Sequence, residues 1–182
     1  PMASGVLPVG LGKASRLFQY LLDKDKVYIA KFKFGFTTDT LDVTGEVQDK
    51  CSLIPSLSEI QAVMSDFVGE IDQIPPKYSA VKINGKRAYE YARNGEEIEI
   101  KPKTLVIDEI ELLEFHDLSA KIRVVCSKGT YIRALARDIG VALNSGAHLT
   151  DLERTRIGDI TLDNCISIND FQEIINNEKM KL

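Results

Sequence analysis

Apolar and polar side chains alternate along several stretches of the chain and predict β-strands there. In residues 26–36 every second side chain, from Tyr28 to Phe36, is aromatic or small and apolar, so one face of this strand is expected to be buried. Residues 104–115 and 119–127 are predicted as two longer strands, and residues 96–100 also alternate. The strands follow one another as hairpins or meanders.

Other stretches space their apolar residues three and four apart, which predicts helices. Ser58 and Gln61 suggest a capping box ahead of the helix in residues 60–68, and Thr130 is a candidate N-cap. The predicted helices cover residues 11–22, 60–68, 86–93, 129–143, 145–155 and 167–182. Because helices and strands do not alternate regularly, we expect an α+β fold with a mixed, largely antiparallel sheet flanked by helices.

The composition indicates one folded domain and excludes several classes of protein. With 182 residues, 44% of them hydrophobic and 27% charged, the chain can bury a core. No apolar run approaches the roughly 18–20 residues of a membrane helix. Three scattered cysteines and two histidines favour neither a disulfide framework nor a metal site. We expect a cytoplasmic protein that uses no metal and no membrane.

Charge is distributed unevenly. The net charge is −4, which argues mildly against a nucleic-acid partner. Residues 119–137 nevertheless carry five basic side chains and no acid. A solvated surface is the more common explanation of such a run, and a binding surface is the alternative.

Two local patterns are candidates for catalytic chemistry. The glycines near the start do not make a phosphate loop, because Leu7 and Ala14 occupy two of its defining positions. Asp39 and Asp42 could form a carboxylate pair for glycosidic chemistry. Their spacing within a polar turn favours a structural role in turn hydrogen bonds instead.

Arg133 is the first residue whose position points beyond the fold. It shares a helical stripe with Thr130 and Arg137, away from the apolar stripe. A cation in the first turn of a helix opposes the helix dipole, so an acidic partner, either a carboxylate or a phosphate, is expected beside it. Tyr28 remains open to a simpler interpretation as a core tyrosine with a hydrogen-bonded hydroxyl.

Four blocks of sequence resemble the bacterial tRNA pseudouridine-55 synthases of the TruB type. The blocks are residues 1–17 (PMASGVLPVGLGKASRL), 26–47 (KVYIAKFKFGFTTDTLDVTGEV), 73–95 (QIPPKYSAVKINGKRAYEYARNG) and 126–155 (CSKGTYIRALARDIGVALNSGAHLTDLERT). They occur in the order found in that family and extend over nearly all of the chain to about residue 160. Such a resemblance is more specific than any single motif.

The resemblance implies that uridine 55 in the T stem-loop of tRNA is isomerised to pseudouridine without a cofactor. It assigns Tyr28 to stacking on the extruded uracil and Arg133 to holding a catalytic aspartate. Asp42 falls in the same arginine–aspartate network, against the structural role that its spacing favoured. Leu152 matches an apolar residue that closes the pocket. The remaining substrate-binding residues implied are Lys82, Tyr78, Lys128 and Tyr131.

The same resemblance gives expectations about the extent of the domain. Residues 1–182 match a catalytic domain without its N-terminal segment, and the catalytic aspartate would stand just before Pro1. The chain would then be inactive as it stands, and a tRNA-binding module without catalysis is the alternative. No C-terminal RNA-binding domain is evident, and a monomer is expected. Glu153 precedes Arg154 where the family usually has two basic residues.

Overall fold

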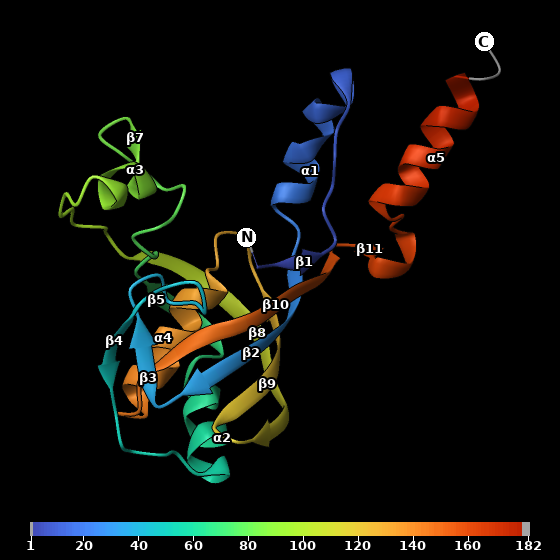
Figure 1. Cartoon of the computed structure of the whole chain (residues 1–182). Helices are drawn as coiled ribbons and strands as arrows, with labels where there is room; N and C mark the ends of the chain where they lie inside the picture. Colours follow the sequence, from blue (N-terminus) through green and yellow to red (C-terminus); the bar gives the residue numbers. More distant parts are fainter. Residues whose placement is uncertain (1, 180–182) are drawn as a thin grey trace.

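A mixed seven-stranded sheet organises residues 2–179, the part of the chain that the computed structural model describes (Figure 1). Its strands lie in the order β1, β10, β2, β9, β8, β5, and β11 pairs with the end of β10. The bounds are β1 Ser4–Gly5, β2 Lys26–Phe34, β5 Gly69–Gln73, β8 Lys103–His116, β9 Ser119–Cys126, β10 Ala147–Ile157 and β11 Ile160–Thr161. The β1–β10 pair is parallel and the others are antiparallel, which confirms the predicted fold class.

Short hairpins surround this sheet, together with the five α-helices of the described part of the chain. The hairpins pair β3 (Phe36–Thr38) with β4 (Val47–Lys50), and β6 (Lys82–Ile83) with β7 (Lys86–Arg87). The helices are α1 Phe18–Leu22, α2 Leu57–Asp66, α3 Ala88–Arg93, α4 Ile132–Ala142 and α5 Ile168–Lys179. A 3₁₀ helix at Gly12–Leu17 precedes α1. Figure 1 shows α1 and α5 projecting from the same side of the sheet.

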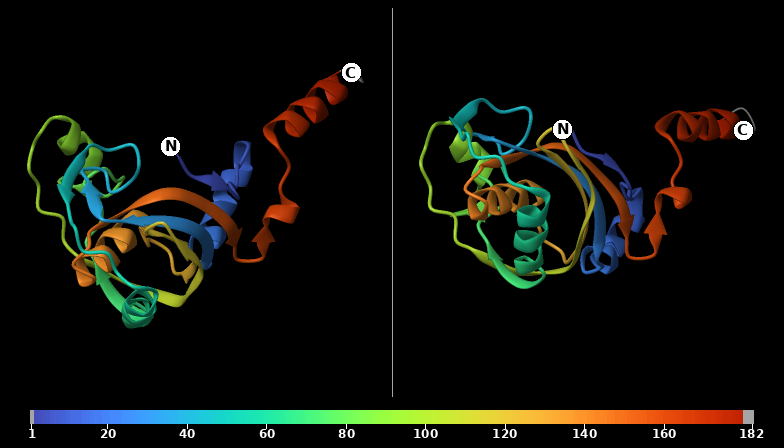
Figure 2. Two further views of the ribbon diagram at one scale, coloured as in Figure 1. Left: turned by 60° about the horizontal axis from the view of Figure 1, so that its bottom comes forward. Right: turned by 90° about the horizontal axis from the view of Figure 1, so that it is seen from below.

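The core lies between one face of the sheet and helices α4 and α2. Alternate residues of β2, such as Ala30 and Phe32, are at most 1% exposed on this face, and Ile122 lies opposite Ala30 on β9. Figure 2 shows the sheet curving around α4 and α2. On α4 the inward stripe includes Leu135 and Ile139, as the helical spacing predicted.

Several local predictions were wrong. Residues 145–155 do not form a helix, because most of them belong to β10, which pairs with β2 and β1 on its two sides. Residues 96–100 form no strand. The capping box of α2 joins Ser56 and Glu59, two positions before the predicted pair. Thr130 does not cap α4, since its hydroxyl donates to the Ser127 carbonyl.

No helix in the described residues is both long and apolar enough to cross a membrane.

Candidate active site

Arg133 lies in the first turn of α4 and bridges two distant loops. Its Nη1 donates to Asp42 Oδ2 and to the Thr40 carbonyl, both at 3.0 Å. Its Nη2 donates to the Tyr78 carbonyl at 2.8 Å. The first turn of α4 contains no acidic residue, so Asp42 supplies the carboxylate expected beside this cation. Three segments of the chain therefore meet at one guanidinium.

Asp42 is held as firmly as its partner. Its Oδ1 accepts from the Thr40 hydroxyl at 2.9 Å, the Thr44 hydroxyl at 2.6 Å and the Thr44 amide at 3.0 Å. Burial by itself raises the pKa of Asp42, but the bonds from Thr44 and Thr40 and the charge of Arg133 outweigh it. The pKa therefore lies below its ordinary value. The ion pair stays ionised at neutral pH.

The loop that carries Asp42 is fixed against β10. The Leu149 amide donates to the Leu41 carbonyl at 3.0 Å, and the Val43 amide donates to the Leu149 carbonyl at 2.8 Å. Leu41 has a φ of 63°, a left-handed conformation that a leucine rarely adopts. The two backbone bonds on either side of Asp42 hold this conformation in place.

Tyr28 and Leu152 lie on the core face of the sheet, the face that α4 covers. In the β2–β10 register Tyr28 pairs with Arg154, and Ala30 pairs with Leu152, so Tyr28 and Leu152 are diagonal neighbours. Partial burial raises the pKa of Tyr28, and the nearby Arg154 offsets part of this rise. Among residues 2–179, no hydrogen bond joins Tyr28 to Arg133 or Asp42. The structure thus places Tyr28 and Leu152 next to each other on the core face.

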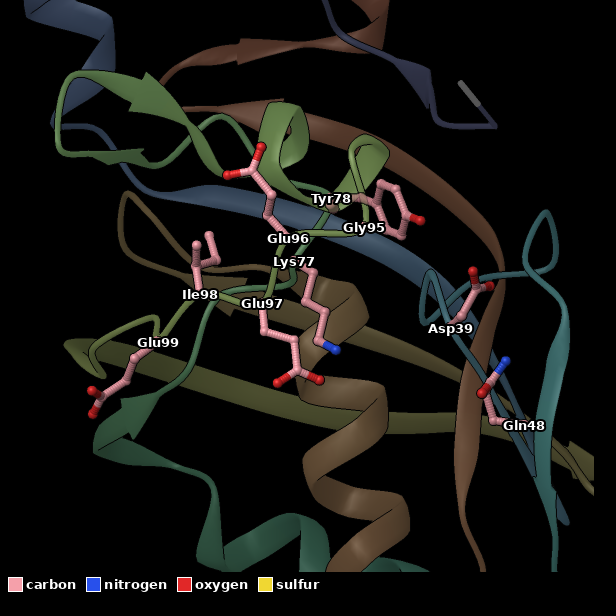
Figure 3. A pocket seen from close by; sticks show the side chains of 10 residues that line it. Asp39, Gln48, Lys77, Tyr78, Gly95, Glu96, Glu97, Ile98 and Glu99 are labelled. Carbon is pink, nitrogen blue, oxygen red and sulfur yellow. The ribbon is translucent and has the colours of Figure 1, made fainter.

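Tyr78 lines a cavity of about 770 Å³ between the loop after α3 and the β3–β4 hairpin. Figure 3 shows Glu96, Glu97 and Glu99 on one side of this cavity and Asp39 on the other. Lys77 is the one basic residue of the lining, so four carboxylates make the cavity net acidic. Such a lining repels phosphate, and the cavity by itself does not suit a nucleotide.

The other predicted substrate-binding residues are dispersed. Lys82 is exposed in β6. Tyr131 is half-buried at the N-terminus of α4, where its amide is bound by Gln73. Lys128 is exposed and forms an ion pair with Asp23. Their assigned roles remain predictions.

The basic run in residues 119–137 does not form one free positive surface. Lys121 and Arg123 point to the sheet face opposite Tyr28, where they pair with Glu114 at 3.0 Å and Glu109 at 2.8 Å. Both side chains therefore already have carboxylate partners, and a binding surface formed by this run stays a prediction. Acidic side chains of β8, the other strand of the same hairpin, neutralise them.

Gln73 and Thr44 were missed by the sequence reasoning. Gln73 Oε1 accepts from the Tyr131 amide at 2.9 Å, and Thr44 makes two bonds to Asp42. Neither residue is charged or part of a catalytic pattern, although both fall within blocks that carry the resemblance. Only their position beside Arg133 and Asp42 draws attention to them.

Within residues 2–179 no group of three or more histidine, cysteine or acidic side chains is arranged to bind a metal ion. The aspartate expected just before Pro1 lies outside the described residues.

Comparisons with known proteins show which family this chain belongs to. The family profile "TruB family pseudouridylate synthase (N terminal domain)" matches residues 1–132, and "tRNA pseudouridylate synthase B C-terminal domain" matches residues 133–181. Proteins named tRNA pseudouridine synthase B from Phocaeicola vulgatus and Parabacteroides distasonis are 49% and 51% identical over all of this chain. The chain spans 77% and 78% of their lengths.

A solved structure, described as a Cbf5-Nop10-Gar1 complex, matches 94% of this chain with a TM-score of 0.70 and 34% identity. The chain spans 42% of the matched protein. Fold and sequence together define a pseudouridine synthase. Within that class, the chain belongs to the TruB family of pseudouridylate synthases.

Proposed function

We propose that this chain belongs to a tRNA pseudouridine synthase that converts uridine 55 of the T stem-loop to pseudouridine. Membership of the TruB family and the tRNA named in its relatives support the substrate class. The similarity of residues 26–47 and 126–155 to the pseudouridine-55 synthases supports the position of the uridine.

The reaction exchanges one glycosidic bond for another within the same nucleotide. The C1′–N1 bond breaks, the uracil turns, and C1′ joins C5. The proton on C5 is lost and N1 gains one, so no external reactant is needed. The target base must leave its stack to be reached. Tyr28 would stack on it, and Leu152, its diagonal neighbour on the core face, would close the pocket.

The arrangement of Arg133 is the observation that carries the proposal. Three of its N–H groups are engaged by Asp42, Thr40 and Tyr78, and its Nε has no partner within residues 2–179. A guanidinium anchored in this way can present its remaining donors to a reacting carboxylate. It would orient that carboxylate and keep it ionised.

Tritium release from [5-³H]uridine-labelled tRNA tests the proposal in the natural full-length protein. We expect release from a tRNA with uridine 55 and none from a transcript with cytidine 55. Arg133→Lys should abolish release, because one ammonium cannot replace the planar set of donors that reaches Asp42, Thr40 and Tyr78. Arg123→Lys is the matched control, since Arg123 lies on the opposite sheet face and should retain full activity.

The other outcomes separate the rival functions. Binding of tRNA without tritium release by the wild-type protein would indicate a binding module. Release of free uracil would indicate a glycosidic hydrolase. Equal release from the cytidine-55 transcript would reject the assigned position.

A further inference from the structure

Gln73 ends the edge strand β5 and contacts the beginning of α4. Its side chain is 1% exposed, and its Oε1 accepts from the Tyr131 amide at 2.9 Å. Tyr131 is the N-cap residue of α4 and caps it with no side-chain hydrogen bond of its own. A glutamine from another element therefore binds the backbone at the end of the helix that carries Arg133.

The chain that follows Gln73 binds the polar stripe of the same helix. The Ile74 carbonyl accepts from Arg137 Nη2 at 2.9 Å, and the Tyr78 carbonyl accepts from Arg133 Nη2 at 2.8 Å. We call residues 73–78 the strap. Two of its contacts are with Arg133 and Arg137, which are four positions apart and lie along one side of α4. The third is with the Tyr131 amide at the N-terminal end of the helix. The strap thus sets both the position of the helix end and the direction of the Arg133 side chain.

The other polar atom of Gln73 is unusual. Its Nε2 is buried and has no hydrogen-bond partner within residues 2–179. Leaving a buried N–H unpaired lowers stability. Replacing the amide by a methionine side chain of similar length removes this unpaired group and leaves the Tyr131 amide unpaired instead. One unpaired buried N–H group thus replaces another. If Gln73 had a purely structural role, this substitution would change neither stability nor activity much.

We propose that Gln73 is a positioning residue for the isomerase reaction, which it serves by fixing the N-terminus of α4 and through it the guanidinium of Arg133. This inference rests on the proposed function. It assigns a catalytic consequence to a residue that does not touch the substrate.

Gln73→Met in the natural full-length protein tests the inference. We expect kcat for tRNA isomerisation to fall about tenfold or more with KM nearly unchanged, because a small misplacement of a catalytic group slows the chemical step. The melting temperature should stay close to that of the wild type. Gln73→Glu keeps an oxygen acceptor for the Tyr131 amide and should restore most of kcat. Gln61→Met, at an exposed position of α2, is the matched control.

A second readout does not depend on activity. The Nε–Hε signal of Arg133 in a ¹H–¹⁵N spectrum, assigned by its loss in Arg133→Lys, should shift in Gln73→Met and return toward wild type in Gln73→Glu. If the wild-type protein proves inactive, the proposed function fails while this signal still reports on the positioning. A folded Gln73→Met protein with an unshifted Arg133 signal, or with wild-type kcat, would overturn the inference.

Discussion

Asp42 Oδ2 accepts a hydrogen bond from Arg133 Nη1 at 3.0 Å, although the two residues are 91 positions apart in the sequence. The Asp42 side chain is 9% exposed. Within residues 2–179 its hydrogen-bond donors are Thr40, Thr44 and Arg133, which come from two short segments. This relationship links the stability of the loop to the chemistry that we propose for the helix end.

Asp42→Asn should lower the free energy of unfolding by about 1–3 kcal/mol, because the variant disrupts hydrogen bonds to a buried charged group. Urea denaturation of the two proteins measures this difference. Asp23→Asn is the control, since Asp23 forms an exposed pair with Lys128 and its loss should change stability little. Similar losses of unfolding free energy in Asp42→Asn and Asp23→Asn would mean that the Asp42–Arg133 pair stabilises the fold no more than an exposed ion pair does.

Tyr28 combines an aromatic ring on the core face with a hydroxyl beside Arg154. Tyr28→Phe should keep tRNA affinity, because the ring that stacks on the base is retained. It should lower kcat by about 10²–10⁴ if the hydroxyl assists removal of the C5 proton. Tyr28→Ala should lose both tRNA affinity and turnover. Filter binding measures the affinity and tritium release measures the turnover. Near-normal turnover of Tyr28→Ala would reject the assignment of this tyrosine.

His148 makes stability depend on pH. It is 2% exposed, stacks on Phe36 with ring centroids 4.2 Å apart, and its pKa lies below the ordinary 6.5, chiefly because of burial. Lys33 also lowers the pKa, and the Phe36 carbonyl and Asp42 partly oppose the shift. The unfolded chain takes up the proton more readily, so this contribution to stability is present above the unfolded pKa and is lost as pH falls.

The free energy of unfolding should therefore decrease between about pH 7 and pH 5, and the decrease should be shallower in His148→Gln. Denaturation at a series of pH values measures the slope. His116, the other histidine of the chain, is exposed, so His116→Gln should keep the wild-type dependence of unfolding free energy on pH. An unchanged slope in His148→Gln would contradict the assignment.

Gly5 permits the close approach of β1 to β10. Its φ is 99°, and a Cβ at this position would overlap the backbone of Arg154. Gly5→Ala should therefore lower the melting temperature more than Gly12→Ala, because Gly12 also has a positive φ of 56° but open space around it. Differential scanning calorimetry compares the two variants. Equal losses would mean that the backbone angle alone, rather than the contact with β10, limits this position.

Affinity for tRNA should fall steeply as salt increases, because lysine–phosphate contacts release counterions. Lys82 is exposed in the β6–β7 hairpin, so Lys82→Ala should make the log–log salt slope less steep by about one phosphate contact. Lys121→Ala should leave it unchanged, since Lys121 lies on the opposite sheet face beside Glu114. An affinity that does not vary with salt would contradict phosphate binding altogether.

The alternation of residues was enough to predict β2, β8 and β9, because each buries one face and exposes the other. It failed for β10. Ala147, His148 and Leu149 are buried in succession, so this strand has no simple alternation at its start. Its partners come from residues 4–5, 26–34 and 160–161, and no pattern within the segment reveals such distant pairing.

The site was predictable only in part for a similar reason. The position of Arg133 near a helix start indicated an acidic partner, but the spacing of Asp42 favoured a turn, and only the resemblance to a family pointed to their network. The turn is present as well, since Asp42 accepts from Thr44 two positions later. Gln73 is an uncharged residue whose effect depends on a contact 58 positions away, so local sequence carries no sign of it.

The convergence of three segments on Arg133 has a consequence for the order of folding. Arg133 is 91 positions from Asp42 and 55 positions from Tyr78, so each of these contacts closes a long loop. We infer that the β8–β9 hairpin, whose ends are joined by a tight turn, precedes the arginine network during folding. On the ribosome the network cannot form until α4 has left the exit tunnel. A nascent chain can therefore pair β8 with β9 before the arginine network forms, whereas β10, which joins β1 to β2 in the sheet, emerges only after α4.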